Sequence, residues 1–224
     1  MARTIRREPK RFISLTRGIR GNRKSDSECR HFGLRTIGHA DALTRESQSV
    51  MERIPNGERF AVDNSKSLDC FLSGRVLVLK DDITKQNVDV IVNAANSTLF
   101  GGGGVDGAIH AKGGPQILEA CREIRRTRFP RGLPTGQVVL TTGGRLPARY
   151  VIHTVGPITR IGQEPDASML ASCYRNSLAL AADTGLRSIA FPAISTGAFG
   201  YPPERAAPVV SETIESVLTA GTLV

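Results

Sequence analysis

The sequence predicts an α/β domain over residues 74–224, preceded by a basic N-terminal extension over residues 1–70. From residue 74 onward, short apolar runs typical of strands alternate with stretches of helical periodicity. Before residue 70, neither periodicity is sustained over ten residues. Alternating strands and helices indicate a sheet covered by helices on both faces. Ligands of such domains bind in loops that follow the carboxyl ends of strands, so these loops are the candidate functional sites.

The predicted strands are short and nearly continuously apolar, as expected for strands buried on both faces. We expect them at residues 75–80 (RVLVLK), 88–92 (VDVIV), 137–142 (QVVLTT), 150–155 (YVIHTV) and 188–194 (SIAFPAI). Helices are expected at residues 115–126, 167–182 and 203–218. In the second helix, a buried stripe with i, i+3, i+4 spacing is formed by Leu170, Cys173, Tyr174, Ser177 and Leu178.

The net charge of +9 is concentrated near the N-terminus. Residues 1–73 carry fifteen Lys and Arg against nine Asp and Glu, whereas the remainder carries fifteen against twelve. Any binding to nucleic acid is therefore expected only through the basic extension. No apolar run approaches the roughly 20 residues that span a bilayer, so no membrane association is expected. A cytoplasmic location is expected, with an organelle as the alternative if the Arg-rich N-terminus is a transit peptide.

The extension is polar, charged and interrupted by glycine, which predicts disorder because little apolar surface is available to offset ordering entropy. A mis-started or non-functional leader and a targeting peptide are the alternatives. The four cysteines, Cys29, Cys70, Cys121 and Cys173, are far apart and form no CxxC pair. They predict free thiols in a reducing compartment. Neither a metal nor a cofactor is expected.

The first candidate loop follows the strand at 88–92 and contains NAAN at 93–96 and GGGGVDGAIH at 101–110. Four consecutive glycines are entropically costly, and here they run directly into a helix start. They are best explained as backbone that approaches a phosphate or sugar closely and offers N–H donors. A flexible connector is the alternative.

Three polar side chains within fourteen residues of this loop, those of Asn93, Asn96 and Asp106, suit sugar hydroxyls or a bound water. Amides offer both a donor and an acceptor, and a carboxylate accepts hydrogen bonds from hydroxyls or water. Asn93 as a turn former and Asp106 as a helix N-cap are the structural alternatives.

The same loop matches the dinucleotide fingerprint G-x-G-x-x-G at Gly102, Gly104 and Gly107, which raises the alternative of an NAD-dependent Rossmann-type enzyme. That fold needs a carboxylate about twenty residues further on, at the end of a second strand. Residues 123–128 instead lie in a charged helical or loop segment. A Walker phosphate loop is excluded because no Gly-Lys-Ser/Thr follows.

The second candidate loop, residues 195–202 (STGAFGYP), follows the strand at 188–194. Small hydroxyl residues and two glycines before a helix predict a second cradle of backbone amides. The loop contains no Lys or Arg, so phosphate charge would be met by N–H groups, which suits a diphosphate that is held and not transferred. Phe199 either packs against a sugar or anchors the loop.

Together these motifs resemble the macrodomain family, specifically MacroD-type ADP-ribosylhydrolases and bacterial O-acetyl-ADP-ribose deacetylases. The likeness runs from about residue 75 to 218 and rests on DIT at 82–84, NAAN at 93–96, GGGGVDGAIH at 101–110, PTG at 134–136, HTVGP at 153–157 and FPAISTGAFGYP at 191–202. It implies a three-layer α/β/α macrodomain with a mixed central sheet. The implied ligands are ADP-ribose, O-acetyl-ADP-ribose and mono-ADP-ribosylated proteins. The implied activity is hydrolysis of ADP-ribosyl esters, with a reader module that only binds as the alternative.

The resemblance also implies roles for individual residues. Asp106 and Asn96 are expected at the scissile distal ribose, and Asp82, with Ile83 beside it, at the adenine amino group. The other expected ligand contacts are Asn93, Gly103, Gly104, Val105, Ser195, Thr196, Gly197, Ala198 and Phe199. His110 and His153 are expected to be structural, and no metal is implied.

Three departures from the family pattern bear on these expectations. Asp81 stands where the family commonly has Gly, and Phe199 where some relatives carry Tyr. The family's last strand and final helix are expected to be missing after Val224. In the family that strand lies between the first strand and the one at 188–194, so we expect unpaired backbone on both neighbours.

Overall fold

The structure, a computed structural model, describes residues 11–16, 67–72 and 75–220. Its seven-stranded mixed sheet has the order β2-β3-β1-β7-β4-β6-β5. The strands are β1 (Arg11–Thr16), β2 (Ser67–Phe71), β3 (Val76–Lys80), β4 (Val90–Ala95), β5 (Val138–Thr142), β6 (Tyr150–Val155) and β7 (Ser188–Pro192). The helices are α1 (Gly104–Gly113), α2 (Pro115–Thr127), α3 (Ala167–Asp183) and α4 (Pro203–Thr219), with a short 3-10 helix η2 (Ile83–Lys85) after β3.

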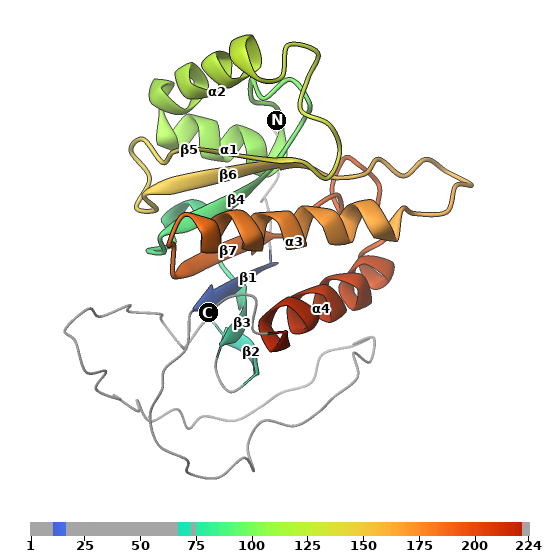
Figure 1. Cartoon of the computed structure of the whole chain (residues 1–224). Helices are drawn as coiled ribbons and strands as arrows, with labels where there is room; N and C mark the ends of the chain where they lie inside the picture. Colours follow the sequence, from blue (N-terminus) through green and yellow to red (C-terminus); the bar gives the residue numbers. More distant parts are fainter. Residues whose placement is uncertain (1–10, 17–66, 73–74, 221–224) are drawn as a thin grey trace, which may run out of the picture.

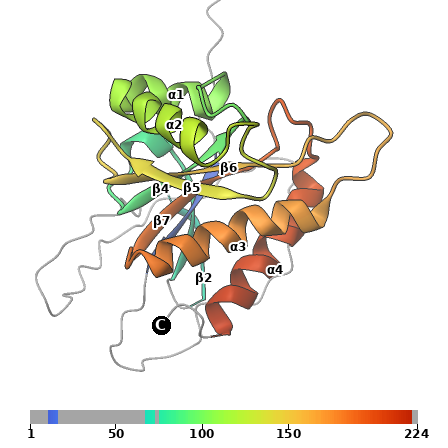
Figure 2. The ribbon, with the colours of Figure 1, turned by 45° about the horizontal axis from the view of Figure 1, so that its top comes forward.

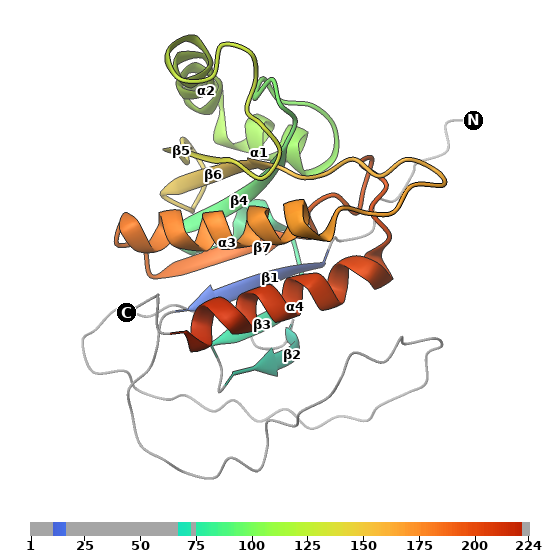
Figure 3. The ribbon, with the colours of Figure 1, turned by 45° about the vertical axis from the view of Figure 1, so that its right-hand side comes forward.

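The helices cover the two faces of the sheet in pairs, α1 with α2 and α3 with α4 (Figures 1 and 3). The alternation of side chains along β4 explains this arrangement. Ile91 and Ala95 belong to the core under α1 and α2, whereas Val90 and Val92 belong to the core under α3 and α4. The strand is therefore buried on both faces, and the predicted three-layer α/β/α architecture with a mixed sheet is confirmed.

The directions of the strands determine at which edge of the sheet the connecting loops lie. β6 and β7 both run parallel to β4, and β3 has the same direction because β1 is antiparallel to both β3 and β7. The carboxyl ends of β3, β4, β6 and β7 consequently lie at one edge of the sheet. The loops that leave these four strands form the candidate site.

The helices begin where their sequences predict. Asp166 caps α3 by accepting a hydrogen bond from the Met169 backbone N–H at 3.0 Å, and Pro115 and Pro203 occupy the first positions of α2 and α4. α3 and α4 lie side by side (Figure 2). The Tyr174 hydroxyl on α3 donates to the Pro192 carbonyl at 3.1 Å, which attaches the end of β7 to this helix layer.

Two strands of the sheet come from the part of the chain that was predicted to be an unstructured extension. β1 lies inside the sheet, where Ile13 pairs with Val78 of β3 and Phe191 of β7, and β2 pairs with the outer side of β3. The division into an extension (1–70) and a domain (74–224) therefore differs from the structure at these strands. The backbone expected to be unpaired is paired instead, because β1 occupies the place between β3 and β7. The other residues before 67 lie outside the described residues.

Two further expectations concern the described part of the chain. Cys121 and Cys173 are buried free thiols, as predicted, while Cys29 lies outside the described residues. Among the described helices, none is both long and apolar enough to cross a membrane.

Candidate ligand-binding site

The loops after β6 and β7 pack directly against each other. The Thr159 N–H donates to the Phe199 carbonyl at 2.8 Å. Gly156 lies so close to the other loop that a Cβ on it would stand 2.0 Å from Ser195 Oγ. The two loops therefore form one continuous wall at the edge of the sheet where β4 also ends.

Asp106 lies in the first turn of α1, in the segment that follows β4 at the same edge of the sheet, and only 4% of it is exposed. Asn93 Nδ2 donates to its Oδ1 at 2.7 Å, and Asn96 Nδ2 donates to its Oδ2 at 3.3 Å. His110 Nε2 lies 3.4 Å from Oδ1. Burial raises the pKa of Asp106, and the Asn93 hydrogen bond and His110 oppose this rise. The N-cap of α1 is Gly103, so the alternative role of Asp106 as the cap is wrong.

A buried polar network on β4, β6 and β5 supports the Asp106 carboxylate. Asn93 pairs with His153 in the parallel register of β4 and β6, so both side chains point to the α1 face. Asn93 Nδ2 also lies 3.1 Å from His153 Nδ1, and His153 Nε2 lies 2.9 Å from Thr141 Oγ1. An amide nitrogen only donates, so Nδ1 accepts and Nε2 carries the proton. Burial, with His110 as a second cause, lowers the pKa of His153 to about 3, so the ring is neutral.

Asn93 therefore differs from its expected role as a ligand contact. Its side chain is fully buried, and its amide is directed to Asp106 and His153. The strand also continues to Ala95, two residues past the predicted turn at Asn93. We assign Asn93 to the support of Asp106.

The described residues contain one group with the composition of a metal site, His110, Cys121 and His153, whose ligand atoms lie within 4.8 Å of one another. Both ring nitrogens of His153 are already within hydrogen-bond distance of Asn93 and Thr141. Burial raises the pKa of the Cys121 thiol to about 12, which favours the protonated form that ligates metals poorly. We therefore interpret this group as part of the buried polar network.

The glycines fall into two kinds. Packing restricts Gly102 and Gly107: a Cβ on Gly102 would make tight contacts of 3.1 Å with Asn96 Nδ2 and Asp106 Oδ2, and one on Gly107 would collide with the Gly102 carbonyl oxygen at 2.3 Å. Among the described glycines, only Gly103 and Gly197 combine an ordinary φ with no atom within 4 Å of a Cβ. Neither the backbone nor the packing of the described residues needs glycine at these two positions. Both stand in the two predicted ligand loops.

The start of α1 adds a partial positive charge to the same place. Its N-cap, Gly103, makes no side-chain hydrogen bond to the first turn. The first backbone N–H groups of a helix have no partner within the helix and attract anions. Residues 93–107 and 193–202 contain no Lys or Arg, so backbone donors are the positive groups that these loops offer.

The remaining predicted residues occupy the outer parts of the site. Asp82 is the N-cap of η2, and its Oδ1 accepts from the Thr84 N–H at 3.0 Å and the Thr84 hydroxyl at 2.7 Å. Ile83 is buried beside it. Ser195 has a left-handed φ of 65°, and its buried Oγ has no hydrogen-bond partner among the described residues. Phe199 packs on the core under α1 and α2, which favours an anchoring role.

The structure thus brings together Asp106, Asn96, Gly103 and the 195–199 loop at one edge of the sheet. The sequence interpretation did not predict that His153 and Thr141 support Asp106 through Asn93. A signal for part of this network was present, because His153 lies in a mostly apolar predicted strand.

The dinucleotide-fold alternative does not fit this arrangement. Glu123, a carboxylate at the expected distance from the glycines, is on α2, and its side chain pairs with Arg126 at 2.7 Å. No strand lies between the glycine loop and β5, so the chain lacks the strand end that would carry a ribose-binding carboxylate in a dinucleotide-binding fold.

Comparison with known proteins defines the class. Residues 92–210 match the Macro domain family. A macro domain-containing protein of Streptomyces griseus is 60% identical over 147 residues, which cover 63% of this chain and 82% of that protein. An O-acetyl-ADP-ribose deacetylase of Escherichia fergusonii is 52% identical over 152 residues, covering 68% of this chain and 85% of the relative.

Solved structures of macrodomains are also similar to this chain. A macrodomain of Oceanobacillus iheyensis with ADP is 51% identical, with a TM-score of 0.58 over 61% of this chain and 72% of that one. A macrodomain of Trypanosoma brucei in complex with ADP-ribose is 44% identical, with a TM-score of 0.56 over 62% and 55% of the two chains. The chain belongs to the Macro domain family, and the predicted family is confirmed.

Proposed function

We propose that this chain binds ADP-ribose and hydrolyses ADP-ribosyl esters at the distal ribose. The observation that carries the proposal is the pair of open glycines, Gly103 and Gly197, on loops that follow β4 and β7 at the same edge of the sheet as the buried carboxylate of Asp106. Open space at a Cβ position is where a ligand can approach the backbone closely. The similarity to relatives with ADP, with ADP-ribose or with deacetylase names supports the same ligand.

In the proposed complex, the diphosphate lies between the glycine loop and the 195–199 loop and accepts hydrogen bonds from backbone N–H groups. Asp82 accepts a hydrogen bond from the adenine amino group, beside Ile83. Val105 borders the distal ribose, and Phe199, packed on the core under α1 and α2, anchors the loop next to it. This mode explains why loops without Lys or Arg can bind a doubly charged group.

In the proposed reaction, water adds across the ester linkage and yields ADP-ribose and a free carboxylic acid. Asp106 and Asn96 orient the water, and Asp106 accepts part of its proton. The raised pKa of Asp106 makes its ionised form a stronger base, while the hydrogen bond from Asn93 favours that ionised form. Positioning supplies several kcal/mol of the barrier reduction, because the carboxylate is fixed on both oxygens.

The binding step is tested by calorimetry with ADP-ribose, AMP and NAD on wild type and on Gly197→Ala and Gly197→Val. We expect ADP-ribose to bind most tightly, with affinity falling as the side chain grows and by at least about tenfold for Val. Melting temperatures should remain near that of wild type, because no atom lies within 4 Å of the new Cβ. A preference for NAD, or unchanged ADP-ribose affinity in Gly197→Val, would contradict the proposed site.

A further inference from the structure

Beside the proposed site lies a group of arginines that the binding of ADP-ribose does not use. They occupy the second half of α2 and the loop after it. We name this group the arginine rim and define it as Arg122, Arg125, Arg126, Arg128 and Arg131. From residue 115 to 133 the only acidic residues are Glu119 and Glu123. The rim therefore carries an excess of positive charge.

Part of this charge has a structural explanation. Arg125 and Arg126 are in the last turn of α2, where cations complement the helix dipole. Arg126 also pairs with Glu123, and the Arg125 guanidinium donates to the Phe129 carbonyl. Neither explanation covers Arg122 and Arg131, which are exposed and form no ion pair with another described residue. Arg128 is also exposed and forms no such ion pair, but its guanidinium lies 5.5 Å from the centre of the Phe129 ring. Arg131 also lies beyond the end of the helix.

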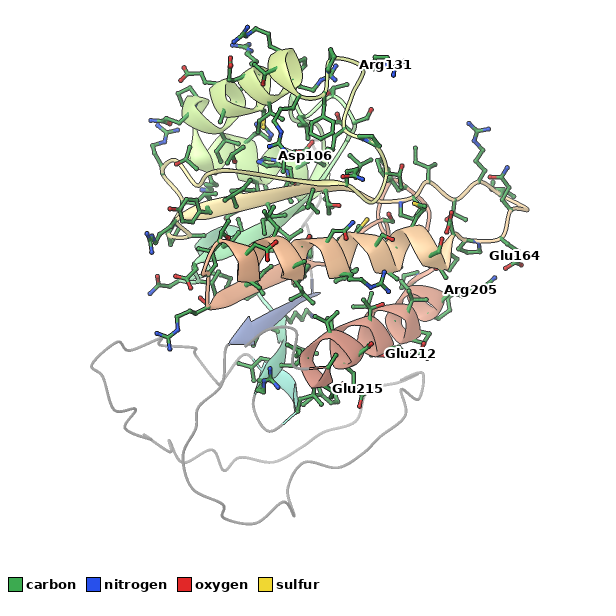
Figure 4. All side chains as sticks on the ribbon, viewed as in Figure 1. Asp106, Arg131, Glu164, Arg205, Glu212 and Glu215 are labelled. Atoms are coloured by element: carbon green, nitrogen blue, oxygen red, sulfur yellow. The ribbon has the colours of Figure 1, made fainter. Side chains whose placement is uncertain are left out.

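The rim is attached to the loop that carries the site. The Leu133 N–H donates to the Ser97 carbonyl at 2.9 Å, and the Arg125 guanidinium lies 5.7 Å from the centre of the Phe100 ring. Ser97 directly follows Asn96, whose amide donates to Asp106, so residues 96 and 97 contact both the carboxylate and the segment that follows the rim. Figure 4 shows Arg131 on the loop that follows α2, on the same side of the sheet as Asp106.

We propose that the arginine rim binds acidic protein segments next to the scissile ester, and thereby selects mono-ADP-ribosylated proteins over small acyl esters of ADP-ribose. This inference rests on the proposed function. The acceptor in a protein ester is an Asp or Glu side chain, and further carboxylates near it would lie over the rim. Charge complementarity of this kind accelerates encounter and excludes wrong partners. A small acyl ester has no group that reaches the rim.

Single-stranded nucleic acid is the competing partner for a basic surface, and the rim suits it less well. Binding without sequence preference relies on aromatic rings on which bases stack. The two aromatic residues of this region, Phe100 and Phe129, each already have a guanidinium over the ring, at 5.7 and 5.5 Å from its centre.

The test uses the full chain and a matched pair of charge reversals. The rim variant is Arg128→Glu with Arg131→Glu. The control is Arg149→Glu with Arg187→Glu, which reverses two exposed arginines next to the amino ends of β6 and β7, at the opposite edge of the sheet. The substrates are a peptide with a mono-ADP-ribosylated Glu flanked by acidic residues, the same peptide with Gln and Asn in place of these residues, and O-acetyl-ADP-ribose.

We expect the rim variant to lose at least about tenfold in kcat/KM on the acidic peptide, mainly through KM, and the loss to shrink at about 0.5 M salt. Rates on the other two substrates, and all rates of the control variant, should stay within about twofold of wild type. Equal losses on all three substrates, or an equal loss in the control, would overturn the proposal. So would unchanged kinetics on the acidic peptide with loss of binding to a single-stranded oligonucleotide.

The outcome separates this inference from the proposed function. If the wild type hydrolyses none of the three substrates, the proposed activity is wrong, and the rim is tested by fluorescence anisotropy of the two labelled ADP-ribosylated peptides. Tighter binding of the acidic peptide that is lost in the rim variant supports the rim. Equal affinity for both peptides overturns it.

Discussion

The buried neutral His153 makes a specific prediction about acid stability. The folded chain holds this ring between Asn93 and Thr141, and burial lowers its pKa from 6.5 to about 3. The unfolded chain titrates near its ordinary value. Between these two pKa values the unfolded chain binds a proton that the folded chain excludes, so the free energy of unfolding rises with pH in this window. Above about pH 7 both states are neutral at this residue, and the effect vanishes.

The magnitude follows from the two pKa values. Lowering the pH from about 8 to about 5 should remove about 2 kcal/mol of stability through His153 alone, and the loss levels off at about 5 kcal/mol below pH 3. The assay is urea unfolding at both pH values, followed by far-ultraviolet circular dichroism because the chain has no Trp. His153→Gln is the comparison, since its amide can still donate to Thr141 and does not titrate.

Every other titratable group is common to the two proteins, so the difference between their pH dependences isolates His153. We expect wild type to lose about 2 kcal/mol more than His153→Gln over this pH range. A difference below about 0.5 kcal/mol would refute the conclusion that the ring is buried and neutral.

Two further predictions concern the elements that frame the site. Ile13→Pro should lower the free energy of unfolding by about 3 kcal/mol or more, because proline removes an N–H donor inside the sheet. Ile13→Val keeps this donor and should lower it far less. Equal urea midpoints for the two variants would show that β1 is not needed in the sheet. Gly156→Ala should lower both the melting temperature and the ADP-ribose affinity, because its Cβ would collide with Ser195 Oγ and Ile194 Cγ2. Gly197→Ala should leave the melting temperature unchanged. Equal melting temperatures of the two variants would contradict the packing of the two loops.

Much of the fold could be predicted from local sequence patterns. α2, α3 and α4 begin at the predicted residues and end one residue beyond the predicted ends. Each has a clear start signal and a 3.6-residue period of apolar residues. β1 could not be predicted in the same way. It is six residues long, and both of its partners are more than fifty residues away in the sequence, so no local pattern reports its place in the sheet.

The sequence predicted the loops of the site but not the buried residues that support them. The run of glycines indicated a ligand loop, yet only the structure distinguishes Gly102 and Gly107, where a Cβ would be crowded or would collide, from Gly103, where it would meet no atom within 4 Å. The burial of Asn93 depends on the register of β4 with β6, which places it opposite His153. Such a register is a property of the folded sheet and could not be read from either strand alone.

The central claim is that Asp106 takes part in hydrolysis and not only in binding. The most direct test compares wild type and Asp106→Ala for turnover of a mono-ADP-ribosylated glutamate substrate, with ADP-ribose affinity and melting temperature measured on the same samples. We predict that kcat falls by at least about tenfold, a barrier increase above roughly 1.4 kcal/mol, while the Kd for ADP-ribose changes less. Hydrolysis by Asp106→Ala at the wild-type rate would contradict the account, and a folded wild type that binds ADP-ribose without hydrolysing any ester would make this chain a reader.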